Sequence, residues 1–269
     1  MTDFNFIEDD TVELGQQFID DGYLVLPAEN LDALERIRRC AAELAASAIG
    51  EELPNDISNF LNNFHERVSI DELNTVRLKV IEGLNKQSWL RAAYFQLARQ
   101  AIFSLVGNEL AMQRRVNLSM QLPQDTSSLL PVHADVWSGD SPYEIVLWVP
   151  LVDCYRTKSM YLMPPAKDRA LQARMGEVFK DSSASNLFKV IEDDVQWMDV
   201  PYGNVLIFSQ TLMHGNQPNE EPDTRWTMNC RFKSLFSPYS DKRLGEFFEP
   251  ITLRPSSRIA LDYELPDGF

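Results

Sequence analysis

The stretch VHADVWSGDSPYEIVLWVP, residues 132–150, joins a polar turn to a run of apolar residues. The turn is rich in Gly, Ser and Pro, and it holds a histidine and an aspartate two positions apart, His133 and Asp135. The apolar run has the length and composition of a buried β-strand. Two potential metal ligands therefore stand beside a strand end, where both side chains can reach one point.

The chain after Gly107 has the pattern of a β-rich body. Short stretches that are rich in apolar and β-branched residues alternate with turn residues, as in antiparallel folds. We expect a helical insertion between residues 165 and 194, with DRALQARMGEVFK as its centre. The strand-like stretches are LAMQRRVNLSMQLP, YEIVLWVPLVDC, KSMYLMPP, NVLIFS and RWTMNCRFKSLF.

The chain before Gly107 is mainly helical in pattern. The stretch VELGQQFIDDGYLVLP begins as a helix and becomes a strand over residues 23–26. A strongly amphipathic helix follows, which Asn30 can cap and after which Gly50 stands. Residues 51–70 are polar and are expected to be irregular. A second helical region covers about residues 71–107, with Gly107 as its C-terminal stop.

Helices followed by strands, with no linker-like composition between them, indicate a single domain over residues 1–269. Helices within about residues 30–107 would buttress a β core of about residues 108–240. A β-sandwich or an open barrel with flanking helices fits this order of elements.

The composition excludes several classes of function. Asp and Glu number 40 against 25 Lys and Arg, which gives a formal net charge of −15. A nucleic-acid binder needs a basic surface, and so does a protein that docks on an anionic membrane. No apolar run approaches the roughly 20 residues of a membrane span, and the first residues do not resemble a signal peptide. Three widely spaced cysteines are typical of reduced thiols, so a cytoplasmic protein with a small-molecule partner is expected.

A third potential ligand completes the His-x-Asp pair. His214 follows the strand-like stretch NVLIFS, and Arg225 opens the next strand eleven residues later. Two histidines and one carboxylate can occupy one face of an octahedral Fe(II), which leaves the other face open. An arginine at a strand start can pair bidentately with a carboxylate. The alternatives are a turn-capping Asp135 beside a surface histidine, and a surface ion pair for Arg225.

The chain resembles the Fe(II)/2-oxoglutarate-dependent dioxygenases of the phytanoyl-CoA dioxygenase-like superfamily over nearly its whole length. FIDDGYLVLP is similar to the opening helix and strand of that family, and HAD to its His-x-Asp motif. IVLWVPLVD resembles the strand that follows, GNVLIFSQTLMHGN the strand with the distal histidine, and RWT the Arg-x-Ser/Thr motif. The sequence departs from the family at residues 165–167, where Pro, Ala and Lys replace the usual Gly-Ser-His.

The resemblance implies a double-stranded β-helix, the jelly-roll core that cupins share. It implies Fe(II) bound by His133, Asp135 and His214, with 2-oxoglutarate as cosubstrate and O₂ as oxidant. Arg225 and Thr227 would hold the far carboxylate of 2-oxoglutarate. Halogenation is not expected, because the halogenating relatives lack the carboxylate ligand. Asn216, which stands where relatives often carry Ser, would donate a further hydrogen bond to that carboxylate.

Strand parity suggests further residues of the cosubstrate site. Residues 144, 146 and 148 share one face of a strand, and Trp148 would lie near the cosubstrate if this face points inward. Asn117 and Gln121 share a face of the preceding strand, and either could contact the C1 carboxylate of 2-oxoglutarate. The alternatives are a core tryptophan and two ordinary edge positions.

The substrate is expected to be a sugar or a sugar-containing metabolite. HADVWSGDSPYEIVLWVPLVDC looks closest to dioxygenases of streptomycin and other carbohydrate clusters and to lipopolysaccharide-sugar (Kdo) hydroxylases. Trp137 and Asp140 could supply a stacking platform and an acceptor. Arg115 and Arg231 could attract an anionic group, although each cation is more often a solvated surface charge.

Three other functions stay open at this point. One is an oxygenase that acts on a non-carbohydrate metabolite, such as an amino acid or an acyl derivative. The second is a cupin-like module that binds metal without turnover, for which a carboxylate-binding arginine would have no purpose. The third is a hydrolase with a zinc-bound water, which more often has three histidines or a nearby Glu base.

Overall fold

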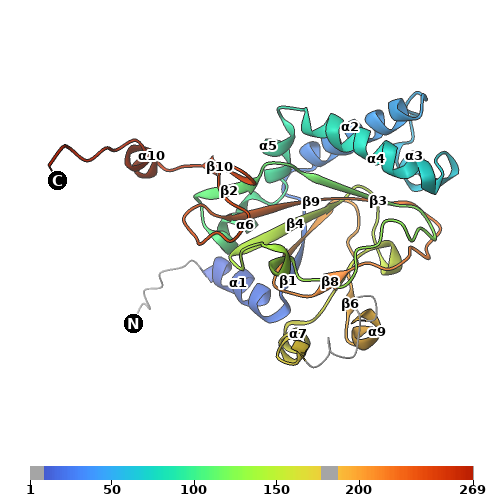
Figure 1. Cartoon of the computed structure of the whole chain (residues 1–269). Helices are drawn as coiled ribbons and strands as arrows, with labels where there is room; N and C mark the ends of the chain where they lie inside the picture. Colours follow the sequence, from blue (N-terminus) through green and yellow to red (C-terminus); the bar gives the residue numbers. More distant parts are fainter. Residues whose placement is uncertain (1–8, 177–186, 269) are drawn as a thin grey trace.

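The computed structural model describes residues 9–176 and 187–268, and two antiparallel sheets form its core (Figure 1). The larger sheet has the strand order β1-β7-β4-β9-β2-β10, and β3 also pairs with β9. Its strands are β1 (Tyr23–Pro27), β2 (Leu110–Gln113), β3 (Asn117–Gln121), β4 (Glu144–Pro150), β7 (Asn204–Ser209), β9 (Arg225–Ser234) and β10 (Phe248–Thr252). The smaller sheet has the order β6-β5-β8 and consists of β5 (Tyr161–Leu162), β6 (Gln196–Trp197) and β8 (His214–Gly215).

The expected architecture of a mainly β core with flanking helices is confirmed, but two strands lie outside residues 108–240. β1 pairs with β7 along its whole length, and β10 pairs with β2 at the opposite end of the larger sheet. β1 and β10 pair with the backbone N–H and C=O groups of β7 and β2, which would otherwise be unpaired at the edge of the sheet. The β core is therefore wider than the sequence indicated.

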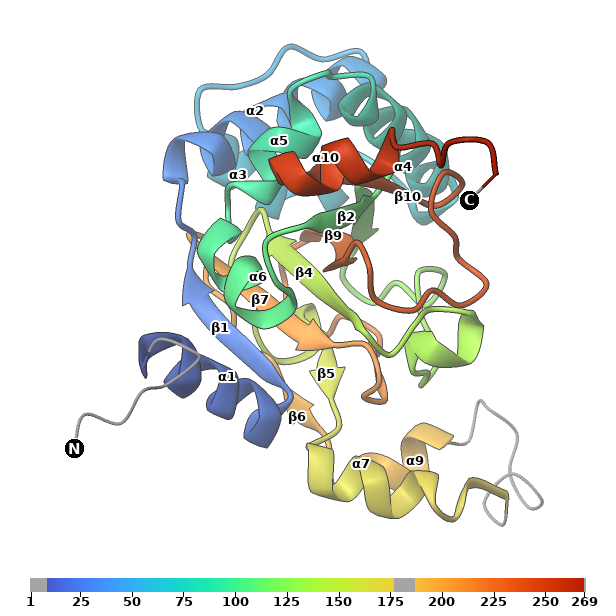
Figure 2. The same ribbon diagram turned by 90° about the vertical axis from the view of Figure 1, so that its left-hand side faces the viewer.

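α2, α3, α4 and α5 lie together on one side of the larger sheet, α1 lies beside β1, and α7 and α9 lie at the other end of the molecule (Figures 1 and 2). α2 is capped by Asn30, whose side chain accepts a hydrogen bond from the backbone N–H of Ala33, as the sequence indicated. No helix in the described residues is long and apolar enough to cross a membrane. The α-helices are α1 (Asp9–Asp21), α2 (Leu31–Ala48), α3 (Ile57–Asn62), α4 (Ile70–Asn85), α5 (Leu90–Phe95), α6 (Arg99–Val106), α7 (Pro165–Gln172), α9 (Leu187–Ile191) and α10 (Pro255–Leu261).

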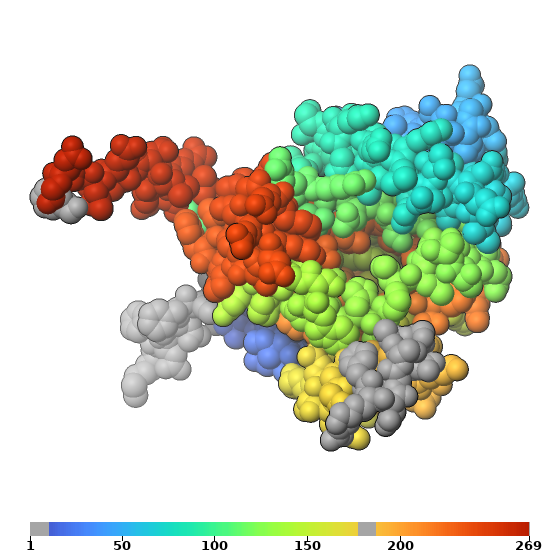
Figure 3. All heavy atoms as spheres, viewed as in Figure 1, coloured from blue at the N-terminus to red at the C-terminus, as the bar shows by residue number. Residues whose placement is uncertain are grey.

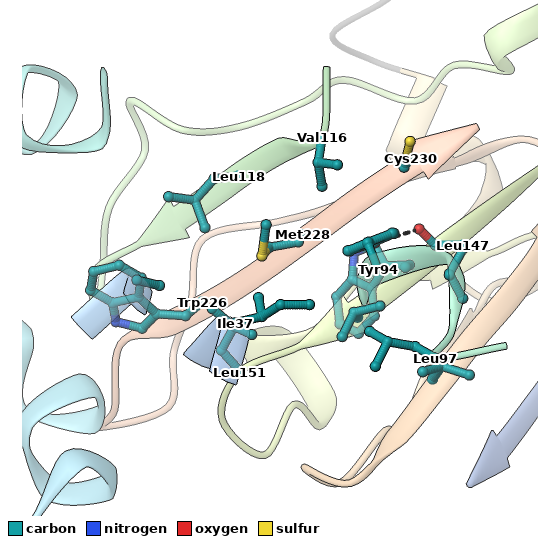
Figure 4. Packing of buried hydrophobic residues seen from close by; sticks show 14 of the residues in the cluster. Ile37, Tyr94, Leu97, Val116, Leu118, Leu147, Leu151, Trp226, Met228 and Cys230 are labelled. Atoms are coloured by element: carbon teal, nitrogen blue, oxygen red, sulfur yellow. Dashed lines mark hydrogen bonds between the residues drawn. The ribbon is translucent and has the colours of Figure 1, made fainter. Parts of the chain in front are cut away.

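β4 connects the helical layer to the interior between the sheets. All of its residues are buried, and alternate side chains point to opposite faces. On the helix side, Tyr94 of α5 donates a hydrogen bond from its hydroxyl to the carbonyl of Leu147 at 2.9 Å, as Figure 4 shows. Ile37 of α2 and Leu151, just after β4, lie in the same apolar layer. The side chains of the even-numbered residues in β4 therefore point away from the helices, into the interior between the two sheets.

The expectation of an irregular segment over residues 51–70 is wrong. α3 and a 3-10 turn (Phe64–Glu66) occupy its centre, and Asp56 caps α3 by accepting from the N–H of Asn59. The ring of Phe64 packs edge-on against Trp226 of β9, with centroids 5.0 Å apart, and the indole N–H of Trp226 donates to Leu61. These helices are too short to show a periodicity among so many polar residues, so only their tertiary packing identifies them.

The insertion at residues 165–194 contains helices, as expected, and residues 177–186 of it lie outside the described part. Pro165 is the first residue of α7, a position where a proline is well tolerated because its missing N–H would have no helical partner. The residues that replace the Gly-Ser-His of the related family thus begin a helix. Asp168 in α7 accepts a hydrogen bond from the backbone N–H of Met213, which ties the helix to the residue before His214.

Replacing Phe64 by Ala tests the correction at residues 51–70. Phe64 is fully buried, so we expect Phe64→Ala to lower the free energy of unfolding by about 3–5 kcal/mol, as for other large cavities. Chemical denaturation followed by circular dichroism measures the change. Phe236→Ala is the matched control, since that ring is 62% exposed and its loss should change stability by no more than about 0.5 kcal/mol. Equal effects of the two substitutions would contradict the packing described here.

Candidate functional site

Two backbone hydrogen bonds hold His133 and His214 side by side. The N–H of His133 donates to the carbonyl of His214 at 3.0 Å, and the N–H of His214 donates back at 2.8 Å. His214 lies in β8, which pairs with β5, so the smaller sheet also fixes it. The imidazole centroids are 4.3 Å apart. The fold therefore brings together two histidines from distant parts of the sequence without using their side chains.

The side-chain hydrogen bonds of both histidines direct Nε2 toward a common point. Nδ1 of His133 lies 2.7 Å from the carbonyl of Pro131, and Nδ1 of His214 lies 2.8 Å from the carbonyl of Leu212. A carbonyl can only accept, so each Nδ1 carries the proton and each Nε2 offers a lone pair. Burial also lowers the pKa of His214 to about 4, because the charged imidazolium loses its hydration. His214 is therefore neutral at physiological pH, as a metal ligand must be.

Asp135 completes a set of three ligand atoms. It begins a 3-10 turn (Asp135–Ser138), and its Oδ1 lies 3.7 Å from Nε2 of His133 and 3.9 Å from Nε2 of His214. One donor atom from each residue lies within 4.8 Å of the others. Adjacent ligands of an octahedral ion with bonds of about 2.1 Å are about 3 Å apart, so a metal ion would require only a small contraction.

β9 runs along the site, from Arg231 beside Asp135 to Arg225 at the other end. Its alternation places Arg225, Thr227, Asn229 and Arg231 on the inward face, opposite the neighbouring strands β3 and β4. These four residues and the three potential ligands line one cavity of about 260 Å³. Figure 3, which looks toward the space between β3 and β8, shows the surface hollowed there. The cavity lies at the small end of ligand sites, which suits one compact molecule and the reacting part of a second.

Arg225 is a buried cation with an incomplete set of partners. Its Nη1 donates to the carbonyl of Ser159 at 3.0 Å, and its Nη2 donates to the hydroxyl of Ser119 at 3.1 Å. Nε is buried without a hydrogen-bond partner, and in the described part of the chain no carboxylate lies within ion-pair distance. Burial lowers the pKa of Arg225 to about 10, so the guanidinium is still charged at neutral pH. A ligand with a carboxylate group, bound in the cavity, would provide the partner that this cation lacks.

Most residues that the sequence suggested for the site lie on the wall of the cavity. Trp148 faces inward with Val146, as the parity of β4 indicated. Asn117 also lines the cavity, although its amide already donates to Asn229 at 3.1 Å. The suggested residues on the wall are His133, Asp135, His214, Arg225, Thr227, Asn216, Trp148, Asn117 and Arg231.

Four suggested residues do not line the cavity. Gln121 is fully buried beside it, where its amide donates to two backbone carbonyls. Asp140 is also buried, and its carboxylate forms ion pairs with Arg231 and Lys242 away from the cavity wall. Arg115 is exposed. Its neighbour Arg114, and not Arg115 itself, forms an ion pair with Glu249. Trp137 is 42% exposed on the turn that follows Asp135, and thus lies at the surface near the ligands.

The structure adds residues that the sequence reading missed. Ser119 and Asn229 have the same strand parity as residues already suggested, so alternation alone could have identified them. Phe208 of β7 and Met160 also line the cavity, and their apolar side chains had no distinguishing signal. Residue 215 must be a glycine, because a Cβ atom at this position would lie only 2.9 Å from the carbonyl oxygen of Leu130.

Comparison with known proteins identifies the fold. No protein-family model matches the sequence, and no curated protein matches it. Solved structures do match. The nickel complex of the non-heme monooxygenase ThoJ has a TM-score of 0.58 and 15% identity, over 91% of this chain and 85% of that one. EctD from S. alaskensis with 2-oxoglutarate and 5-hydroxyectoine has a TM-score of 0.55 and 16% identity, over 89% of this chain and 80% of that one.

A third match carries both a metal and a cosubstrate. HygX from Streptomyces hygroscopicus, with nickel and 2-oxoglutarate bound, has a TM-score of 0.52 and 14% identity, over 88% of this chain and 90% of that one. At these identities the similarity establishes the fold. The core is a jelly roll of the type found in non-heme oxygenases, as the sequence resemblance implied.

The burial of Glu144 can be tested through the pH dependence of the free energy of unfolding. It lies on the inward face of β4, and burial raises its pKa to about 7. The unfolded chain ionises this group near its ordinary value, so between about pH 4.5 and 7 the native state binds more protons than the unfolded state. We expect the free energy of unfolding to fall as the pH rises through this window, and Glu144→Gln to remove that part of the slope. Denaturant titrations of both proteins at several pH values measure it, and identical slopes would contradict the assignment.

Proposed function

We propose that this protein is an Fe(II)- and 2-oxoglutarate-dependent oxygenase that hydroxylates a C–H bond of a small polar substrate, with release of succinate and CO₂. The observation that carries the proposal is the pairing of two features in one cavity. Three convergent ligand atoms lie at one end, and a buried arginine without a carboxylate partner lies at the other. A dicarboxylate that binds a metal through one end would complete both.

The donor set supports iron. Two neutral imidazoles and one carboxylate on one side of an ion form the set that non-heme Fe(II) oxygenases use, and the open side accepts a bidentate ligand and O₂. When bound, Fe(II) would supply the activation of O₂. The part of His133, Asp135 and His214 is to hold the ion in one position and to leave its other side accessible. ThoJ and HygX were solved with nickel, a metal that binds similar ligands.

The inner end of the cavity supports 2-oxoglutarate. Arg225 can donate from Nε and Nη2 to the far carboxylate, and the hydroxyls of Thr227 and Ser119 lie on the same wall. Water is largely excluded there, because Arg225 is 4% exposed and Thr227 1% exposed. An unpaired charge in such surroundings is costly, so carboxylate binding relieves a penalty that the free protein bears.

We further propose a sugar or sugar-containing metabolite as the substrate, in keeping with the phytanoyl-CoA dioxygenase-like members that the sequence resembles. Amide and hydroxyl groups of Asn117, Asn229 and Ser119 give the cavity a polar wall suited to a polyhydroxylated molecule. The exposed indole of Trp137 could stack on a sugar ring near the ligands. The structure of EctD with 2-oxoglutarate and 5-hydroxyectoine favours an amino-acid derivative as the second candidate.

Neither a metal-binding module without turnover nor a zinc hydrolase accounts for the buried Arg225. A module that only binds metal has no reason to keep a buried guanidinium without a counterion, given its desolvation cost. A zinc hydrolase needs a base beside the metal-bound water. The described residues offer no glutamate in the ligand cluster, and Glu144 is already bound by Gln210 and the backbone of Ser141.

Turnover of 2-oxoglutarate tests the proposed reaction. With Fe(II) and O₂, the wild-type protein should release succinate in the presence of its substrate, and more slowly without it. We expect His133→Ala to abolish succinate release and to weaken Fe(II) binding strongly. His65→Ala is the control, because His65 contacts Thr224 outside the ligand cluster. Loss of iron in the His65 variant but not in the His133 variant would overturn the assignment.

Arg225→Lys tests the cosubstrate end separately. A lysine keeps the charge but cannot reproduce the two-pronged contact, so binding of 2-oxoglutarate should weaken by about 2–5 kcal/mol. Titration of 2-oxoglutarate under argon, followed by the metal-to-ligand charge-transfer band of the Fe(II) complex, gives the dissociation constant. The exposed Arg115→Lys should leave it unchanged. An unchanged midpoint in Arg225→Lys would mean that the far carboxylate is bound elsewhere.

A further inference from the structure

Every nitrogen of the Arg231 guanidinium is engaged by another side chain of the protein. Nη2 lies 2.9 Å from Oδ1 of Asp135, and Nη1 donates to Gln113 at 3.3 Å. Nε lies 3.1 Å from both Gln210 Oε1 and Asp140 Oδ1. Arg231 has the contacts of a residue that holds another side chain in place.

The charges around Arg231 balance without a metal. Asp135 and Asp140 are two buried carboxylates, with side chains 9% and 0% exposed, and they would repel each other if left alone. Arg231 bridges them, and Lys242 forms a second ion pair with Asp140. Two negative and two positive groups therefore make a neutral cluster. The cluster thus compensates the burial of the potential metal ligand Asp135 within the chain.

Asp140 explains how Arg231 can stay beside a bound cation. A divalent ion on Asp135 would repel a guanidinium whose Nη2 lies only 2.9 Å from Oδ1 of that residue. The carboxylate of Asp140, held between Arg231 and Lys242, offsets this repulsion. Without Asp140, Arg231 would lose its second carboxylate and would be free to turn away from the ion.

A second set of contacts fixes the direction of Arg231. The side-chain amide of Gln210 accepts from Arg231 and donates to Oε2 of Glu144, so its orientation is determined on both sides. Glu144 in turn accepts from the backbone N–H of Ser141 at 2.9 Å, in the turn that also carries Asp135. The hydroxyl of Ser141 donates to Pro238, and the N–H of Lys242 donates to Gly139. The segment after β9 is therefore attached to the metal-binding turn.

We propose that Arg231 is the positioning residue of the metal site, and that Asp140 and Gln210 act through it. Arg231 holds Oδ1 of Asp135 in the direction of the two Nε2 atoms through their ion pair, and the same oxygen can also bind one metal ion. Asp135 is thereby restricted to one ligating oxygen, which leaves space for a bidentate cosubstrate. The inference rests on the metal-binding part of the proposed function and assigns Arg231 no contact with substrate.

Metal titration without cosubstrate tests this inference. Co(II) is the probe, because its visible d–d spectrum reports the number and kind of ligands, and its dissociation constant can be measured by calorimetry. We expect Arg231→Gln to weaken Co(II) binding about 10–100-fold, as for other residues that orient a metal ligand, and to change the d–d bands. Arg231→Lys should recover part of the affinity. Arg115→Gln, an exposed position outside the cavity, should leave both readouts unchanged.

A double-mutant cycle shows whether Asp140 acts through Arg231. Asp140→Asn should also weaken Co(II) binding and alter the spectrum, and the Arg231→Gln/Asp140→Asn double variant should be no weaker than Arg231→Gln alone. Additive losses would show that Asp140 acts by another route and would overturn the linked role. Unchanged affinity and spectrum in Arg231→Gln would overturn the role of Arg231.

The outcomes also separate this inference from the proposed function. If the wild-type protein and His133→Ala bind Co(II) equally weakly, the metal site itself is refuted. If the wild type binds tightly and Arg231→Gln binds equally well, only the positioning role is refuted. A purely structural role predicts a lower unfolding temperature with the affinity and spectrum of the folded fraction unchanged, and that result would also count against the proposal.

Discussion

The reciprocal backbone hydrogen bonds between His133 and His214 are the constraint on which the site depends. They join the turn before β4 to the smaller sheet, so the backbone of each histidine is fixed by the other. The side chains add orientation to this placement, since each Nδ1 is satisfied by the carbonyl of the residue two positions earlier. The convergence of the Nε2 atoms is therefore a property of the jelly roll and does not need an ion to create it.

The two inward arginines of β9 show how a chain of net charge −15 uses buried cations. Arg231 is surrounded by side-chain acceptors and belongs to a neutral cluster, whereas Arg225 has one carbonyl, one hydroxyl and an unpartnered Nε. Ion pairs compensate the desolvation of Arg231, whereas Arg225 has no carboxylate within ion-pair distance in the described residues, and Asp125 acts on it from a longer distance. Both arginines lie on the same face of the same strand, and under the proposed function only Arg225 would bind a ligand.

The alternation of side chains along a β-strand predicted the parts of the site that lie on strands. The alternation of RWTMNCR places Arg225, Thr227 and Arg231 on one face, and the parity of β4 places Trp148 inside. The sequence could not predict the partners of Arg231, because they depend on how the segment after β9 docks on the turn that carries Asp135. For this reason Asp140 was predicted to be an acceptor for a substrate, whereas it forms ion pairs with Arg231 and Lys242. The helical turns within residues 51–70 were missed because their apolar residues become recognisable only when they pack on β9.

The unequal exposure of the three potential ligands indicates where a substrate would approach. The side chain of His133 is 27% exposed, while those of His214 and Asp135 are 8% and 9% exposed. The inner end of the cavity closes on Arg225, so a cosubstrate that occupies it leaves only the side of His133 open. Leu130, which is 57% exposed, and Trp137 border that side on the segments that flank the histidine. Under the proposed function, iron and cosubstrate binding would thus belong to the rigid strands, and substrate selection to the turns on either side of His133.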